Sequence, residues 1–385
     1  MKVAGDWLGH PGTQALMQAL ESAGHKALFV GGCIRNALLR EPVSDVDIST
    51  DATPETVSAI AEAAGFKPVP TGIDHGTVTV VADGKPHEVT TFRRDVETDG
   101  RRAVVAFSDK IEEDAQRRDF TMNALYADRH GTVIDPLGGL PDLHARHVRF
   151  VGDAETRIRE DYLRILRFFR FHAAYGDPEG GIDPDGLAAC AALAEGLDGI
   201  SRERITAELR KLLTARDPAP AVAAMSHAGV LAYVLTDADP RVLAPLVHFE
   251  AGHLDADQPP RWLRRLSVLG GDTDQLRLSK AEGRDLAALR TALGSTDTAA
   301  ALGWKLGETL GSDAVLARAA SFGTHPLQDW EAEVHRGAKA RFPVTAADLM
   351  PALQGEALGA RLKALEARWL ASDLTLSRDA LLKGT

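Results

Sequence analysis

The sequence predicts an α+β protein, with a mixed α/β part at the N-terminus and an all-helical remainder. Up to about residue 140, short β-rich runs alternate with helical stretches and meet at turn signals. After Pro141, apolar residues recur with the 3.6-residue period of a helix, and Leu and Ala dominate the second half. The length of 385 residues suits two or three domains.

Turn signals and periodicity place the individual elements. Asp83-Gly84 is a hairpin signal between two β-rich runs, and Ser201 is a suitable N-cap for a helix over 202–213. The polar, charged stretch 92–117 predicts a long mobile loop of the kind that often carries function. Strands are predicted at residues 26–30, 46–49, 77–82, 87–92, 125–127 and 132–134.

Composition excludes several classes of function. The formal net charge is −11, so the chain is not a general polycation for nucleic acid, although a local basic patch remains compatible with an RNA partner. The two cysteines, Cys33 and Cys190, provide neither a disulfide framework nor a zinc site. The first residues carry no apolar signal core, and the uncharged stretch 218–236 contains two prolines. We therefore expect a cytoplasmic protein without a membrane element.

Two carboxylates, Asp45 and Asp47, lie at the predicted strand 46–49. Because side chains alternate along a strand, both point to the same face, where they repel each other unless a divalent cation lies between them. Read alone, the pair also fits a polar strand end or turn. Glu88 on a neighbouring predicted strand favours a site for two Mg²⁺ ions, one activating an attacking hydroxyl and one neutralising a triphosphate.

A glycine pair upstream of this strand indicates a phosphate. Gly31 and Gly32 would let the backbone approach a phosphate and donate N–H groups to it. Arg35 would reach the same group with two parallel hydrogen bonds. The sequence around them matches neither the P-loop pattern nor the GxGxxG dinucleotide pattern, which disfavours kinases and dehydrogenases.

The segment RRDFTMNALYAD, residues 117–128, would contribute to the same site. Arg117 and Arg118 would add positive charge for a triphosphate. Asp119 and Asn123 would form local hydrogen bonds or touch a ribose. Seen alone, the first three residues also fit the solvated start of a helix.

Residues 160–172 predict an amphipathic helix with Asp161, Arg164 and Arg167 on its polar side. A solvated face with an ion pair one turn apart also explains this pattern. Alternatively, the two side chains read the edge of a base, because the Asp161 carboxylate accepts hydrogen bonds and the Arg164 guanidinium donates them. Cytosine and adenine both present an exocyclic amine, which donates, beside a ring nitrogen, which accepts. Uracil and guanine present the opposite pattern, so such a pair would select C and A without a nucleic-acid template.

The ordered set of segments resembles the class II tRNA nucleotidyltransferases, that is, the CCA-adding enzymes and the related bacterial poly(A) polymerases. The resemblance covers residues 25–215 and rests on GGCIRN with SDVDIST, HEVTTFRRD, RRDFTMNALYAD, DPLGGLPDL, EDYLRILRFFRF and SRERITAELRKLL. It implies a nucleotidyltransferase head of polymerase β-like fold at residues 1–142, a base-recognising neck at 143–215, and a helical body and tail binding tRNA at 216–385. The implied reaction is Mg²⁺-dependent addition of CCA to the tRNA 3′ end from CTP and ATP.

The resemblance also implies roles for single residues. Asp45 and Asp47 would bind Mg²⁺ and, with Glu88, form the catalytic set. One departure is Asn36, where the first motif commonly carries Asp; the amide keeps hydrogen bonding and loses the charge. Arginines within 93–102, 146–170 and 261–290 are candidate contacts to the RNA backbone, each also compatible with a solvated surface charge. The implied nucleotide-binding residues are Gly31, Gly32, Arg35, Arg117, Arg118, Asp119, Asn123, Asp161, Arg164, Arg167 and Arg170.

Three alternatives remain open. A poly(A) polymerase is disfavoured because its basic segment between the first two motifs is not found in VPTGIDHGTVTVV. A partial enzyme adding only CC or only A is disfavoured by the full length of residues 92–117. A non-catalytic RNA-binding protein is disfavoured by the intact Asp45, Asp47, Asp161 and Arg164.

Arg164→Ala should lower discrimination against UTP and GTP by roughly 5- to 100-fold, because the guanidinium supplies half of the pattern that reads the base edge. Incorporation rates with each nucleotide alone would measure this. A loss of activity with unchanged selectivity would show that Arg164 does not read the base.

Overall fold

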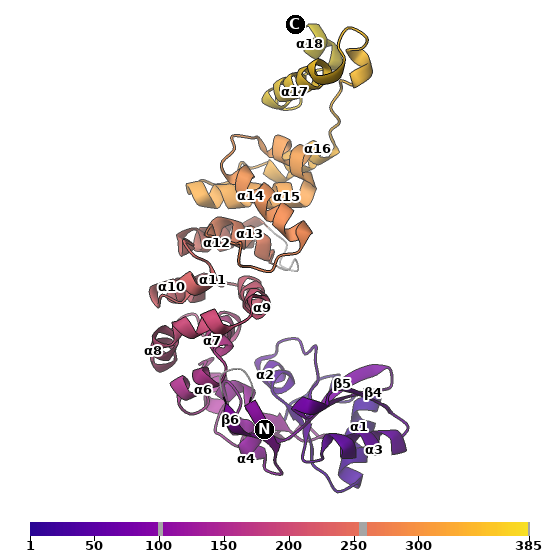
Figure 1. Ribbon diagram of the computed structural model, residues 1–385, viewed down its shortest axis with the longest axis vertical. Helices are drawn as coiled ribbons and strands as arrows, with labels where there is room; N and C mark the ends of the chain where they lie inside the picture. Colours follow the sequence, from indigo (N-terminus) through magenta and orange to yellow (C-terminus); the bar gives the residue numbers. More distant parts are fainter. Residues whose placement is uncertain (99–102, 254–259, 384–385) are drawn as a thin grey trace. The chain divides into compact units, whose positions relative to one another are not determined.

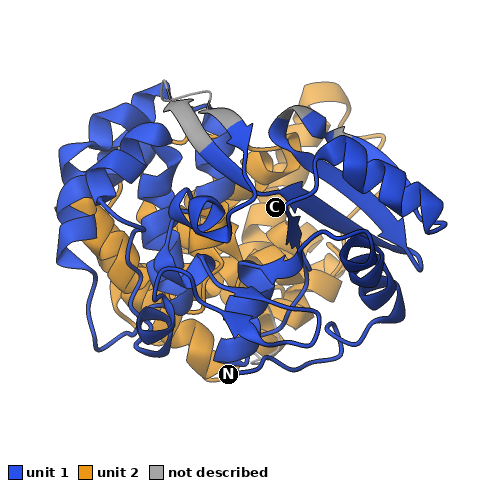
Figure 2. Ribbon diagram, turned by 90° about the horizontal axis from the view of Figure 1, so that it is seen from below, with its two compact units in different colours: residues 1–208, 227–234 blue, residues 209–226, 235–385 orange. Residues whose placement is uncertain are grey.

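The computed structural model describes residues 1–98, 103–253 and 260–383. Its residues fall into two units, residues 1–208 with 227–234 and residues 209–226 with 235–385 (Figures 1 and 2). The first unit holds a mixed α/β part and the remainder is helical, as the sequence predicts. The predicted borders at 142/143 and 215/216 remain predictions.

A seven-stranded sheet with strand order β3-β4-β5-β2-β1-β8-β9 organises unit 1. Neighbouring strands are antiparallel except β2 and β5, which are parallel with Ile48 opposite Val89. The strands, including the separate hairpin β6–β7, are β1 (Ala27–Val30), β2 (Ile48–Thr50), β3 (Lys67–Gly72), β4 (Thr77–Ala82), β5 (Lys85–Thr91), β6 (Arg93–Thr98), β7 (Ala103–Phe107), β8 (Tyr126–Ala127) and β9 (Val133–Ile134).

The strand predictions are largely confirmed. Asp83 and Gly84 join β4 to β5 with positive φ values of 50° and 73°, as a tight hairpin turn requires. The strand β3 was missed because Pro68 and Pro70 weaken its signal; β3 lies at the edge of the sheet, where prolines are tolerated.

Two strand-level predictions are wrong. The strand β2 begins at Ile48, so Asp45 and Asp47 lie before it rather than in it. Residues 92–117 are not one long loop, because β6 pairs with β7 and a helix, α4 (Ile111–Gln116), follows. The first turn of α4 carries three acidic residues, which favour a helix start. Residues 99–102 of this segment lie outside the described residues.

Helices of unit 1 cover both faces of the sheet. The helices α1 and α3 lie against β1, β3 and β4 (Figure 1). On the other face, Leu28, Val30 and Tyr126 form a core with Ala115 of α4. The helices are α1 (Pro11–Ser22), α2 (Gly32–Leu39), α3 (Pro54–Ala63), α4, α5 (Leu140–His144), α6 (Ala154–Glu160), α7 (Leu163–Tyr175), α8 (Pro184–Ala192) and α11 (Leu231–Val234), with 3₁₀ turns η1 (Ile73–His75), η2 (Thr121–Asn123) and η3 (Ala194–Gly199).

An aromatic cluster positions α7 within unit 1. The ring of Phe120 lies 5.0 Å from that of Phe150 and 4.9 Å from that of Phe171, measured between centroids. Phe150 stacks on Phe168 at 5.3 Å. The apolar face of α7 therefore packs on the segment that carries Asp119.

The helices of unit 2 complete the chain. Their bounds are α12 (Leu243–His253), α13 (Trp262–Leu269), α14 (Lys280–Leu293), α15 (Ala299–Phe322), α16 (Trp330–Lys339), α17 (Gly355–Ala371) and α18 (Arg378–Lys383), with η4 (Pro240–Val242) and η5 (Ala346–Asp348). The helices α9 (Arg202–Leu213) and α10 (Ala219–His227) contribute residues to both units. Within the described residues, no helix is both long and apolar enough to cross a membrane.

Buried ion pairs hold α12, α13 and α15 together in unit 2. Glu250 accepts hydrogen bonds from Arg264 at 2.7 Å and from Arg265 at 2.6 Å. Arg264 also donates to Asp313 at 2.8 Å, and Arg265 donates to the carbonyl of Leu213 at 2.8 Å. Arg264 and Arg265 are each 2% exposed, so the prediction that they contact RNA is wrong. Arg101 and Arg102, also candidates for RNA contact, lie outside the described residues.

Glu250→Ala should lower the free energy of unfolding by about 3–5 kcal/mol, because it leaves two buried guanidinium groups without their shared carboxylate. Urea unfolding would measure the change. Glu308→Ala, which removes an exposed partner of His335, is the matched control and should change stability far less. Equal losses in the two variants would contradict this reading.

Candidate active site

Three predicted carboxylates line one cavity of about 610 Å³. The cavity lies where β5 borders the segment before β2. The strands β2 and β5 are parallel, with Ile48 opposite Val89. The residues that precede this pair, Asp47 and Glu88, therefore lie beside each other on neighbouring segments. Glu88 points away from the core because its strand neighbours His87 and Val89 are buried on the opposite face. Asp45 completes the acidic wall.

The electrostatics of this wall suit a cation. The pKa of Asp47 rises from its ordinary value of 3.8 to about 6, chiefly through burial and further through the charges of Glu88 and Asp45, while Arg118 opposes the rise. A divalent cation would relieve this repulsion, so the donor set fits such an ion. In the described part of the chain, no group of three or more His, Cys, Asp or Glu side chains is arranged to hold a metal ion by itself. Mg²⁺ commonly combines one or two carboxylates with substrate phosphates, so an open set is compatible with it.

The predicted glycine turn lies beside the acidic wall, at the start of α2. Gly31 precedes α2 with φ 71° and ψ −116°, a conformation that L side chains rarely adopt. A Cβ atom on Gly31 would lie 3.3 Å from Nη1 of Arg118. The backbone conformation therefore favours glycine, and any larger residue would also require the Arg118 guanidinium to shift by a few tenths of an ångström.

A buried carboxylate that the sequence analysis did not single out, Asp114, holds the arginines of this region. It accepts hydrogen bonds from Arg117 at 2.9 Å, from Arg118 at 3.1 Å and from the hydroxyl of Tyr126 at 2.7 Å. Burial alone would raise the pKa of Asp114, but the charges of Arg118 and Arg117 lower it to about 2. The spacing of three and four residues from Asp114 to Arg117 and Arg118, at the C-terminal end of α4, is the signal that would have found it.

A second cavity, of about 270 Å³, collects most of the predicted nucleotide-binding residues and is called here the base pocket. Arg118 lies in its wall, and the positive charge of Arg118 opposes the rise in the pKa of Asp47 in the acidic cavity. Arg170 does not line the pocket; it donates to Glu208 at 2.5 Å. The lining residues are Arg117, Arg118, Asp119, Asp161, Leu163, Arg164, Arg167 and Arg204.

Asp161 and Arg164 both line the base pocket, but their side chains do not form an ion pair across one helical turn. The helix predicted over 160–172 is interrupted, because Asp161 is extended (φ −155°, ψ 103°) and caps the N–H of Leu163 at 3.1 Å. Asp161 pairs with Arg204 at 2.6 Å instead. The alternative explanation, an ion pair between Asp161 and Arg164, is therefore not found, whereas both residues line one cavity, as their proposed role in base recognition requires.

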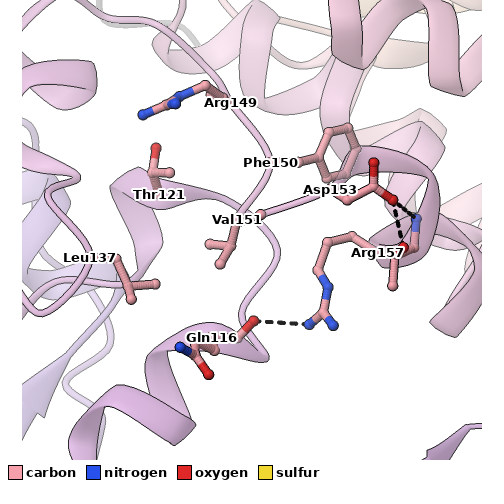
Figure 3. A pocket seen from close by; sticks show the side chains of 10 residues that line it. Gln116, Thr121, Leu137, Arg149, Phe150, Val151, Asp153 and Arg157 are labelled. Atoms are coloured by element: carbon pink, nitrogen blue, oxygen red, sulfur yellow. Dashed lines mark hydrogen bonds between the residues drawn. The ribbon is translucent and has the colours of Figure 1, made fainter.

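Arg164 is fixed from the other side by Glu160. Glu160 forms ion pairs with both Arg164 and Arg157, and Arg164 also donates to the carbonyl of Arg117 at 3.1 Å. Arg157 borders a third cavity, of about 500 Å³, where its guanidinium donates to the carbonyl of Gln116 at 2.9 Å (Figure 3). None of the predicted site residues lines this third cavity.

Arg35 lies at the centre of a hydrogen-bonded chain. Its guanidinium donates to Oδ1 of Asn123 at 2.6 Å and to the hydroxyl of Tyr175 at 2.8 Å. Asn123 donates to Asp119 at 2.9 Å, and Asp119 accepts from Arg167 at 2.8 Å. Only tertiary folding brings Tyr175 and Arg204 to their partners, so no local sequence signal reveals them.

Comparison with protein families matches two parts of the chain. Residues 27–149 match the family described as the Poly A polymerase head domain. Residues 181–241 match the family described as a probable RNA and SrmB-binding site of polymerase A. The first match includes the acidic wall and the glycine turn.

Comparison with single proteins gives longer matches. The mitochondrial CCA tRNA nucleotidyltransferase 1 of Danio rerio is 34% identical over 371 residues, 92% of this chain and 85% of that protein. The CCA-adding enzyme of Geobacillus stearothermophilus is 43% identical over 221 residues, 57% of this chain and about half (53%) of that protein. The crystal structure of the Bacillus stearothermophilus CCA-adding enzyme in complex with CTP aligns with a TM-score of 0.71 and 32% identity, covering 94% of this chain and 93% of that one.

Asp47→Asn should raise the free energy of unfolding of the metal-free protein at pH 7 by about 1–3 kcal/mol. Asp47 is an acid whose pKa is higher in the folded state, so it contributes no penalty below pH 3.8, where both states are protonated. As pH rises toward 6, the unfolded state releases its proton first and stability is lost. The increase in the free energy of unfolding should therefore develop between pH 3.8 and about pH 6. Urea unfolding in the presence of a chelator, repeated over this pH range, would measure it. Asp45→Asn, at an exposed position, is the control and should gain less; a gain independent of pH would contradict the electrostatic cause.

Proposed function

The chain belongs to the family of CCA-adding tRNA nucleotidyltransferases, and on this basis we propose that it adds or repairs the 3′-terminal CCA of tRNA from CTP and ATP without a nucleic-acid template. The observation that carries the proposal is that Arg118, which lines the base pocket, lies near Gly31 and acts electrostatically on Asp47 of the acidic cavity. The acidic cavity supplies groups for phosphoryl chemistry, and the base pocket supplies a hydrogen-bond donor and an acceptor for the edge of a base. We place the protein in the cytoplasm.

In the proposed reaction, the tRNA 3′-hydroxyl attacks the α-phosphate of the nucleotide in line and pyrophosphate leaves. Asp45 and Asp47 would hold the divalent cation, Mg²⁺, which when bound activates the hydroxyl and neutralises the triphosphate. Gly31 and Gly32 would let the phosphates approach the start of α2. Arg118, held in place by Asp114, would neutralise the transferred and leaving phosphates.

Base selection would follow from the base pocket. Asp161 would accept from the exocyclic amine of cytosine or adenine in exchange for its contact with Arg204. Arg164 would donate to the ring nitrogen, with its guanidinium already fixed by Glu160 and the carbonyl of Arg117. Arg167, paired with Asp119, would support the pocket from behind. The RNA would be held by shape and backbone contacts.

The decisive experiment combines the protein, Mg²⁺ and a tRNA lacking its 3′ CCA, with CTP and ATP supplied alone and together, and resolves products at single-nucleotide length. We expect growth by three nucleotides that stops, and loss of the product in Asp45→Ala by at least about 100-fold, because a metal ligand is removed.

The same experiment separates the alternatives. A long ladder with ATP alone would identify a poly(A) polymerase, a family that shares the head domain. A product that ends after two nucleotides would identify a CC-adding enzyme. Binding of tRNA without any extension would identify a non-catalytic RNA-binding protein and overturn the proposal.

A further inference from the structure

Asn36 makes two hydrogen bonds of opposite kind. Its Oδ1 accepts from Nε and Nη2 of Arg35 at 3.1 and 2.8 Å, and its Nδ2 donates to the carbonyl of Pro42 at 2.8 Å. A guanidinium only donates and a carbonyl only accepts, so the orientation of the amide is fixed by its partners. An aspartate, common at this position in related motifs, could accept from Arg35 but could not donate to Pro42.

Pro42 begins the segment, residues 42–47, that carries the two predicted metal ligands. The far end of this segment is fixed to the sheet, because the carbonyl of Asp47 accepts from the N–H of Val30 at 3.1 Å. The near end follows α2, whose last turn closes when the N–H of Glu41 donates to the carbonyl of Asn36 at 2.8 Å. The side chain of Asn36 thus holds the Pro42 end of the segment, while Val30 holds the Asp47 end.

The other side of Asn36 is attached to a rigid group. Arg35 is 7% exposed, and its guanidinium lies 4.0 Å from the centre of the Tyr175 ring. Its bond to Asn123 continues to Asp119 and from there to Arg167 in the base pocket. One hydrogen-bonded chain therefore runs from the carbonyl before the metal ligands to the pocket that would read the base.

We infer that Asn36 is a positioning residue, which holds residues 42–47 in a fixed relation to Arg35 and thereby to the base pocket. Its effect on nucleotide addition rests on the proposed function, whereas the tether itself is a property of the free protein. The side chain acts through the segment and not on the substrate.

Asn36→Asp tests the tether, because it retains the acceptor for Arg35 and places a carboxylate against the Pro42 carbonyl. Losing one such hydrogen bond should speed amide hydrogen exchange in peptides spanning 41–48, and at Val30, by about 3- to 10-fold in the free protein. The Mg²⁺ concentration for half-maximal CCA addition should rise by a similar factor. Arg40→Gln is the control, since it changes the net charge equally at an exposed position at the end of α2.

A second variant separates the two bonds of Asn36. Asn36→Ala removes both and should also raise the KM for CTP and ATP, whereas Asn36→Gln, which retains an amide, should recover part of the protection. Unchanged exchange in Asn36→Asp and Asn36→Ala, or an equal change in Arg40→Gln, would overturn the inference. Because exchange is measured without substrate, this outcome is distinct from a wild-type protein that shows no CCA addition, which would overturn the proposed function alone.

Discussion

The buried carboxylate of Asp119 is the constraint on which the base pocket depends. One oxygen accepts from Arg167, and the other accepts from Asn123 and from the N–H of Phe120. Burial alone would raise the pKa of Asp119, but Arg167 and these hydrogen bonds lower it, so the group stays ionised. The buried aromatic cluster around Phe120 packs beside Asp119. Removing this carboxylate would leave Arg167 with only the more distant Glu208, at 3.9 Å, and Asn123 without its acceptor.

Most arginines around the candidate site in unit 1 are paired with a carboxylate of the protein itself. Arg117 and Arg118 are held by Asp114, Arg164 by Glu160, and Arg170 by Glu208. Each guanidinium is therefore oriented before any substrate arrives, and little conformational entropy remains to be lost on binding. Arg35 differs, because the acceptors that it contacts directly are the uncharged Asn36, Asn123 and Tyr175.

Sequence reasoning predicted the fold class, most strands and the residues that gather in two cavities. It predicted these because strand alternation, glycine turns and paired charges are local signals. It failed at Asp161, where a change of chain direction between α6 and α7 replaces the expected helical turn. It also failed at Arg264 and Arg265, since a buried cluster of ion pairs and a solvated basic surface read alike in a sequence. The first failure is a local break in a helix, and the second concerns partners on other helices.

The two prolines of β3 affect the tendency of the protein to aggregate at high concentration. The strand β3 ends the sheet order, where an exposed row of backbone groups could pair with a strand of another molecule. Pro68 and Pro70 lack the N–H group that such pairing needs, and the register between β3 and β4 shifts after Val69. The edge is thereby a poor template for growth, which protects the folded chain against assembly into extended β-aggregates.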